Sequence, residues 1–188
     1  ALIDRYAAGE RQALRGTMKA VAPREYPEVG VYHPDMKARM SEKLADLPRR
    51  RGTKGTVGVL MLRSYVLAKD AAHYDGVIAA LEARGLDVIP AFAGGLDGRP
   101  AIEQLCMKDG KSAVDAVINL TGFSLVGGPA YNETAAAEAI LSKLDRPYIA
   151  AHPVEFQTLQ AWGANRQGLL PLESTMMIAI PELDGGTV

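Results

Sequence analysis

The chain has 188 residues, of which 48% are hydrophobic and 23% are charged, and its formal net charge is −1. This composition is typical of a globular domain and excludes a disordered tail, a collagen-like repeat and a coiled coil. The near-neutral charge gives no reason to expect nucleic acid or an anionic membrane as the main partner, and the sequence has no run of 18 uncharged apolar residues that predicts a transmembrane helix.

The charge is divided unevenly along the chain. Residues 1–54 hold 12 Lys/Arg against 7 Asp/Glu, whereas residues 55–188 hold 9 against 15. We interpret this as a basic helical face that docks on an acidic domain, or as two solvated surfaces. A nucleic-acid arm is the alternative, but the basic cluster Arg49-Arg50-Arg51 has no interleaved aromatic residues for base stacking.

Two helices joined by an irregular connection over residues 23–34 are predicted in the first 54 residues. Apolar residues recur at helical spacing over residues 1–19, and Met36, Met40, Leu44 and Leu47 predict a second amphipathic helix over residues 35–46. Pro48 and the basic stretch to Gly55 read as an exposed hinge. We therefore expect a domain boundary near residue 54, with a helical lead-in and basic linker over 1–54 and an α/β domain over 55–188.

Strands and helices alternate after residue 54. The continuous apolar run over residues 57–62 is typical of a parallel strand buried on both faces. A helix with the stripe Tyr74, Val77, Ile78 and Leu81 follows, and Gly85 caps it. Further strands are predicted at 86–92, 116–120, 148–151 and 176–180, and further helices at 100–107, at 132–144 with Asn132 as N-cap, and at 154–162.

This alternation predicts an α/β fold with an open, mostly parallel sheet, Rossmann-like or flavodoxin-like, preceded by a helical segment. Ligands of such sheets bind in the crevice outside the carboxyl ends of the strands. The loops to search are therefore residues 63–70, 93–98, 121–131 and 152–155.

The loop that begins Thr121-Gly122-Phe123-Ser124 is rich in small residues, which let backbone N–H groups approach a ligand. It matches neither G-x-G-x-x-G nor the nucleophile elbow G-x-S-x-G, and no P-loop motif occurs in the chain. The loop is either a tight turn without a ligand or a binding loop for an unspecified ligand.

Two other loops carry polar groups. His152 is predicted to end a strand with Glu155 three residues later, a spacing suited to proton transfer or a weak metal contact, although two ligands do not make a metal site. A hydrogen-bonded structural histidine is the alternative. Arg63-Ser64-Tyr65 follows the first strand, where a guanidinium can pair with an anionic ligand group, and His73 is expected at a surface or capping position.

Several of these segments resemble the large, porphyrin-binding H subunits of magnesium chelatases. The resemblance rests on residues 55–68 and 73–78, on the loop Thr-Gly-Phe-Ser-Leu-Val-Gly-Gly-Pro-Ala-Tyr-Asn at 121–132, on residues 150–157 and on residues 173–185. It covers most of residues 55–185 and is more diffuse over residues 1–54. The related cobaltochelatase large subunits share the domain, but the loop is more similar to the magnesium enzymes of the bacteriochlorophyll branch.

The resemblance implies a subunit that holds protoporphyrin IX while Mg²⁺ is inserted, in the cytoplasm of a bacterium that makes bacteriochlorophyll. It also implies two partner subunits, an AAA+ ATPase and an integrin-like protein, and ATP hydrolysis by these partners. Among the loop residues, Arg63, Ser64, Tyr65, Thr121, Gly122, Phe123 and Ser124 are then candidates for porphyrin contact, His152 and Glu155 are candidates for a base, and no resident metal is expected.

Family members are several times longer than this chain, and the His-Gly and Glu-containing segment suspected of metal insertion lies further along. We therefore expect a fragment that is inactive alone. The alternatives are a cobaltochelatase fragment acting on a corrin precursor, and a non-catalytic α/β module whose loops dock on other domains.

Overall fold

The computed structural model describes residues 25–48, 54–128, 131–154 and 156–186. The predicted helix at 1–19 and most of the predicted hinge lie outside these residues. Within them, a central sheet has the strand order β10-β7-β3-β4-β1-β2. The strands of this sheet are β1 (Val29–Tyr32), β2 (Met40–Ser41), β3 (Thr56–Leu62), β4 (Asp87–Ala93), β7 (Ala116–Asn119) and β10 (Tyr148–Ala150).

The four strands β10, β7, β3 and β4 are parallel, in the order expected for a flavodoxin-like sheet. The predicted mostly parallel α/β fold is therefore confirmed, as are the strands predicted near 57–62, 86–92, 116–120 and 148–151. Strands β1 and β2 add an antiparallel edge next to β4.

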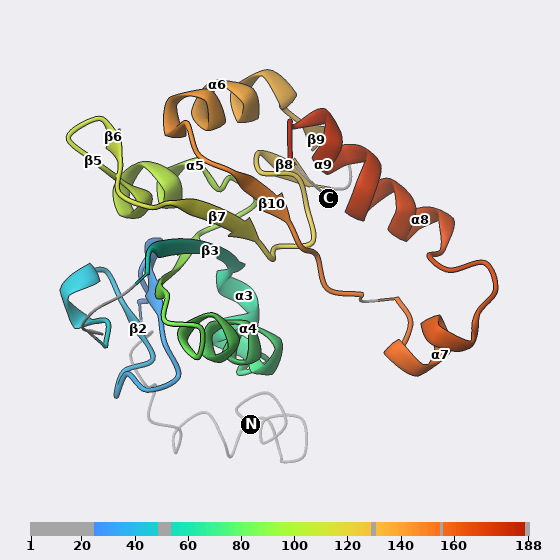
Figure 1. Ribbon diagram of the computed structural model, residues 1–188, viewed down its shortest axis with the longest axis horizontal. Helices are drawn as coiled ribbons and strands as arrows, with labels where there is room; N and C mark the ends of the chain where they lie inside the picture. Colours follow the sequence, from blue (N-terminus) through green and yellow to red (C-terminus); the bar gives the residue numbers. More distant parts are fainter. Residues whose placement is uncertain (1–24, 49–53, 129–130, 155, 187–188) are drawn as a thin grey trace, which may run out of the picture.

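Helices cover both faces of the sheet (Figure 1). One face carries α3 (Arg63–Ala68) and α4 (Ala72–Glu82), and the other carries α5 (Arg99–Ala101), η2 (Ile102–Cys106) and α6 (Thr134–Leu144). Alternate residues of β3 pack on opposite sides, with Val57, Val59 and Met61 in the core under α4 and Leu60 in the core under α6. This explains why β3 is apolar along its whole length.

Helix α4 and the helical turns α5 and η2 confirm two predicted helices. Gly85 has a φ of +81°, and its N–H donates to the carbonyl of Glu82, so it ends the turn after α4 as predicted. Helix α6 is also confirmed, but its predicted N-cap is wrong. Asn132 lies in β9 (Tyr131–Asn132), which pairs with β8 (Gly127–Gly128), and the residue before the helix is Glu133.

The helix predicted over residues 35–46 is wrong. These residues form turns, β2 and the short 3-10 helix η1 (Leu44–Asp46), and β1 and β2 belong to the same sheet as β3. The boundary predicted near residue 54 therefore separates residues that share one sheet. Tyr32 explains the outcome, because its buried hydroxyl donates to Asp75 Oδ1 of α4 at 2.5 Å and holds β1 against that helix.

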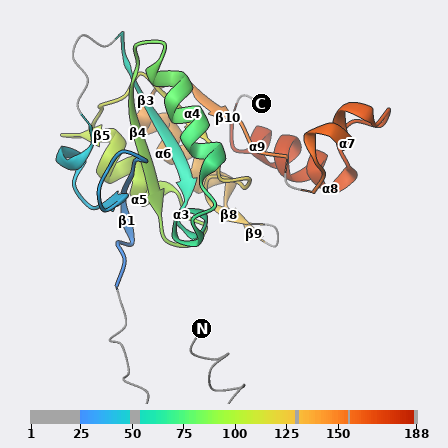
Figure 2. The ribbon, with the colours of Figure 1, turned by 90° about the horizontal axis from the view of Figure 1, so that it is seen from below.

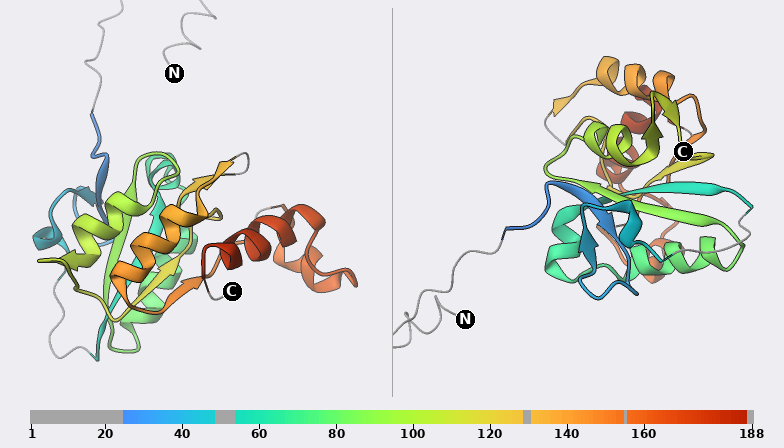
Figure 3. Two further views of the ribbon diagram at one scale, coloured as in Figure 1. Left: turned by 90° about the horizontal axis from the view of Figure 1, so that it is seen from above. Right: turned by 90° about the vertical axis from the view of Figure 1, so that its left-hand side faces the viewer.

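The C-terminal residues form a helical arm beside the sheet, seen in all views (Figures 1, 2 and 3). It contains α7 (Leu159–Ala164), α8 (Pro171–Ser174), η3 (Thr175–Ala179) and α9 (Ile180–Leu183). The strand predicted at 176–180 is therefore wrong, since a short apolar run suits a helix as well as a strand. The helix predicted at 154–162 begins later, at Leu159, where the side chain of Thr158 accepts a hydrogen bond from the N–H of Ala161.

Two small antiparallel pairs complete the fold, β5 (Met107–Lys108) with β6 (Lys111–Ser112) and β8 with β9. In the part of the chain that the structure describes, no helix is long and apolar enough to cross a membrane.

Candidate functional site

The order in which strands are added to the parallel sheet reverses at β3. The chain passes from β3 to β4 on one side and then to β7 on the other, so the loops after β3 and β7 diverge. Such a switch point leaves a crevice at the carboxyl ends of the strands, where α/β proteins of this type bind ligands. The crevice lies at the ends of β3, β4 and β7, as the sequence predicts.

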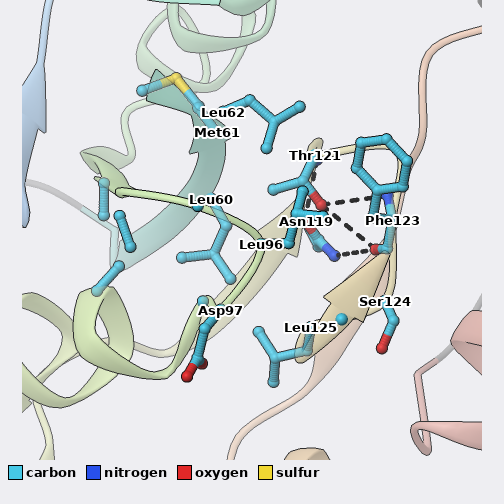
Figure 4. Close-up of a pocket in the computed structure, with 16 residues that line it drawn as sticks. Leu60, Met61, Leu62, Leu96, Asp97, Asn119, Thr121, Phe123, Ser124 and Leu125 are labelled. Atoms are coloured by element: carbon cyan, nitrogen blue, oxygen red, sulfur yellow. Dashed lines mark hydrogen bonds between the residues drawn. The ribbon is translucent and has the colours of Figure 1, made fainter. Parts of the chain in front are cut away.

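A pocket of about 360 Å³, including its open mouth, occupies this position. It is mainly apolar, and its polar groups come from Asp97 in the loop after β4, from Asn119 and from the loop after β7 (Figure 4). Its lining includes Leu60, Leu62, Ala93, Gly95, Leu96, Asn119, Thr121, Phe123, Ser124 and Leu125. A pocket of this volume admits a small group.

Asn119, the last residue of β7, holds the loop at the mouth of this pocket. Its side chain is 1% exposed, and its Oδ1 accepts from the N–H of Thr121 at 3.0 Å. Its Nδ2 donates to the carbonyl of Phe123 at 3.1 Å and to the hydroxyl of Tyr148 at 2.7 Å. This buried amide therefore fixes the first part of the loop, and its hydrogen bonds appear in part in Figure 4.

His152 reaches the same loop from the end of β10. Its Nδ1 accepts a hydrogen bond from the N–H of Gly122 at 3.1 Å. Burial lowers the pKa of His152 to about 4, and the nearby carboxylate of Asp184 opposes this effect. The ring is thus neutral at pH 7, and the proton on a neutral ring belongs on Nε2, because Nδ1 is an acceptor.

This arrangement makes His152 a weak proton acceptor, because its free lone pair is already used by Gly122 and its pKa is far below neutrality. Its Nε2 is buried and has no hydrogen-bond partner within the described residues. The ring is therefore poorly suited to remove a proton, and it does not line the switch-point pocket. The second predicted base, Glu155, lies outside the described residues.

Asp184, at the end of α9, is a buried carboxylate that no sequence pattern indicated. It is 1% exposed, and its Oδ2 accepts from Ser124 Oγ at 2.5 Å and from the N–H of Leu125 at 3.0 Å. Its Oδ1 is buried without a partner among the described residues. Because Ser124 bonds to this carboxylate and not to His152, the three residues do not form a hydrolase triad.

Arg63 is the first residue of α3, directly after β3. The loop predicted over residues 63–70 is therefore wrong, since most of it is helix. The guanidinium Nη1 lies 2.9 Å from Glu28 Oε1 and donates to the carbonyl of Pro27 at 2.9 Å. The predicted anion-binding arginine therefore does hold a carboxylate, but one from the chain itself.

The neighbours of Arg63 lie apart from the switch-point pocket. Ser64 is exposed, and Tyr65 lines a separate, open pocket with His73 and Pro153. The rings of Tyr65 and His73 meet edge to face, with centroids 5.5 Å apart. Of the predicted contact residues, only Thr121, Phe123 and Ser124 line the switch-point pocket, while Gly122 contributes its N–H to His152.

Two glycines let the loops around the pocket approach each other. Gly127 has a φ of +131°, and a Cβ there would collide with the carbonyl oxygen of Tyr131. A Cβ on Gly98 would meet a side-chain carbon of Leu125 at 2.8 Å. Within the described ranges, no three His, Cys, Asp or Glu side chains are grouped so that they could hold a metal ion.

The comparisons with known proteins agree with each other. The sequence profile of the CobN/Magnesium Chelatase family matches residues 2–188. The magnesium-chelatase H subunit of Cereibacter sphaeroides is 55% identical over 186 residues, which is 99% of this chain and 15% of that protein. Its counterpart in Rhodobacter capsulatus is 56% identical over 186 residues, again 99% of this chain and 15% of that protein.

A solved structure has a similar backbone. The catalytic subunit of cobaltochelatase from Mycobacterium tuberculosis superposes with a TM-score of 0.63 and 25% identity, over 92% of this chain and 14% of that chain. The present chain thus spans about one seventh of the length of the proteins that it matches.

Proposed function

The chain belongs to the CobN/magnesium chelatase family, and we propose that it forms part of the porphyrin-holding H subunit of a magnesium chelatase. The observation that carries this proposal is the 55% identity to a magnesium-chelatase H subunit along 99% of the chain. The cobaltochelatase alternative has less support, because the cobaltochelatase structure is 25% identical.

In the proposed reaction Mg²⁺ is a substrate that enters the ring of protoporphyrin IX. Two pyrrole N–H protons leave as the ion takes four ring nitrogens as ligands. Mg²⁺ prefers oxygen ligands and loses its water reluctantly, so the insertion has to be driven. In this proposal partner subunits, an AAA+ ATPase and an integrin-like protein, supply that drive by ATP hydrolysis, and this chain itself has no P-loop motif.

The geometry limits what this part of the protein does in that reaction. The switch-point pocket has the volume of a small-ligand site, so a tetrapyrrole would rest on its mouth with one edge inserted. Thr121, Phe123 and Ser124 would contact that edge. His152 would hold this loop through the N–H of Gly122 and stay neutral, so another group would have to accept the pyrrole protons.

A chimeric protein tests the proposal. The matching region of the Cereibacter sphaeroides H subunit is replaced by this chain, and the product is assayed with its partner subunits, ATP, Mg²⁺ and deuteroporphyrin. We expect magnesium insertion at a rate within about tenfold of the parent. A chimera that folds and joins the partner subunits but inserts no Mg²⁺ would contradict the proposal, and insertion of Co²⁺ into a corrin precursor would favour the alternative.

A docking module is the second candidate, because large apolar side chains are exposed along the C-terminal arm. Phe156 is 52% exposed, Leu159 is 73% exposed and Leu172 is 52% exposed. If the chimera keeps its activity and porphyrin affinity with Thr121, Phe123 and His152 all replaced by alanine, the chain acts by docking and not by porphyrin contact.

A further inference from the structure

The ion pair between Arg63 and Glu28 brings together one largely buried and one exposed side chain. Arg63 is 23% exposed and is held additionally by the carbonyl of Pro27. Glu28 is 77% exposed, although its carboxylate lies 2.9 Å from the guanidinium. The arginine is therefore held by two groups of the chain, whereas most of the Glu28 side chain faces solvent.

The backbone leaves a space for this carboxylate. Val29 of β1 pairs with Ala93 of β4, and the carbonyl of Glu28 accepts from the N–H of Gly94 at 2.6 Å. A Cβ on Gly94 would collide with Glu28 Oε2 and would lie 3.3 Å from Arg63 Nη2. The carboxylate thus occupies the side-chain space of Gly94, under the guanidinium.

The residues next to this space in the chain line the switch-point pocket. Ala93 and Gly95, on either side of Gly94, both line the pocket, and Arg63 follows directly after Leu62, which lines it as well. Arg63 and Gly94 are not in the lining themselves, so a ligand at the mouth of the pocket would need a side chain that extends past Leu62 and Ala93 to bring a carboxylate to Arg63.

We propose that Arg63 and the bare backbone of Gly94 form a carboxylate-binding site, that Glu28 fills it in the free protein, and that a carboxylate of the ligand displaces Glu28. The forked guanidinium suits a planar carboxylate. Displacement costs little, because ion pairs with an exposed partner contribute little to stability. Glu28 then competes with the ligand's carboxylate for Arg63. It lowers the affinity for such ligands although its own side chain does not enter the pocket.

The assignment of the ligand rests on the proposed function, in which the ligand is a porphyrin with carboxylate side chains. The test uses the chimeric protein and two probes, deuteroporphyrin and its diamide, which has no carboxylate. Binding is followed by quenching of protein fluorescence for the unchanged chimera, Glu28→Gln, Arg63→Gln and the double variant.

We expect Glu28→Gln to bind deuteroporphyrin about two- to fivefold more tightly, the range of a weak surface ion pair, and to bind the diamide unchanged. Arg63→Gln should weaken deuteroporphyrin binding alone, and adding Glu28→Gln to it should give no gain. Equal affinities of Glu28→Gln and the unchanged chimera for deuteroporphyrin would overturn the proposal.

A second readout does not depend on porphyrin. Phenylglyoxal modifies accessible arginines, and peptide mass spectrometry reports the rate at Arg63, with the exposed Arg84 as internal control. Arg63 should react faster in Glu28→Gln, and propionate should slow that reaction. If neither porphyrin binds, the proposed function fails for this chain, and the carboxylate site is then decided by the propionate experiment. Slower modification of Arg63 in the presence of propionate supports the site, and an unchanged rate overturns it.

Discussion

Acid should destabilise the fold through His152. Burial lowers the pKa of this ring to about 4 in the folded chain, whereas an unfolded histidine has a pKa of about 6.5. Above pH 6.5 the ring is neutral in both states, and the full stability is present. Between about pH 6.5 and pH 4 the unfolded chain takes up a proton that the folded chain does not, so the free energy of unfolding falls.

The difference between the two pKa values corresponds to about 3 kcal/mol at about 1.4 kcal/mol per pH unit. Part of the ring reaches solvent, which reduces the effect, so we expect His152 to contribute a loss of about 2 kcal/mol between pH 7.5 and pH 4.5. This is a large part of the stability of an ordinary domain, commonly about 5–15 kcal/mol.

Urea unfolding of the chain and of His152→Asn at the two pH values isolates this contribution from the carboxylates that also titrate in acid. Asparagine keeps an acceptor near the position of Nδ1 for the N–H of Gly122. On acidification the unchanged chain should lose about 2 kcal/mol relative to the variant, and His73→Asn should not cancel the loss. A stability difference between chain and variant that is the same at both pH values would refute the reasoning.

Three other buried positions give further predictions. Asp184→Asn should lower the pKa of His152 further, because the carboxylate supports the protonated ring, and should cost about 1–3 kcal/mol; NMR titration and urea unfolding measure the two effects. Gly127→Ala should destabilise the fold by about 2–4 kcal/mol in thermal unfolding, because the added Cβ collides with the backbone. Gly95 also has a positive φ but has open space around it, so Gly95→Ala should cost only about 1–2 kcal/mol. Cys106 is buried, which raises the pKa of its thiol to about 12, so Ellman's reagent at pH 8 should react with it only after unfolding.

The parallel sheet was predictable because each of its strands carries a local signal. β3 is apolar throughout, and helices of clear 3.6-residue period separate the strands that follow. The antiparallel edge was not predictable, because β1 is held by contacts far along the chain, such as the hydrogen bond from Tyr32 to Asp75. Met36 and Met40 have the four-residue spacing of a helix, although they do not form one. No local feature reveals that Tyr32 pairs with Met40 in the sheet.

The candidate site was predictable in its position and less so in its contacts. The strand ends pointed to Arg63, to the loop from Thr121 to Ser124 and to His152, and the loop residues Thr121, Phe123 and Ser124 do line the pocket. Asn119 had a usable signal, a polar residue that closes a buried strand. Asp184 and Glu28 had none, since each reaches the site from more than 30 residues away in sequence.

Those distant contacts change how the site has to be understood. The hydrogen bonds from Ser124 and Leu125 to Asp184 join the pocket loop to α9, the last helix of the C-terminal arm. The arm also carries exposed apolar residues such as Leu159 and Leu183. If a partner covers the arm and shifts α9, we expect Asp184 and the pocket loop bonded to it to move as well. We predict that docking on the arm and ligand binding at the pocket are coupled through this buried carboxylate. Asp184→Asn should then weaken that coupling, measured as the change in ligand affinity when the partner is added.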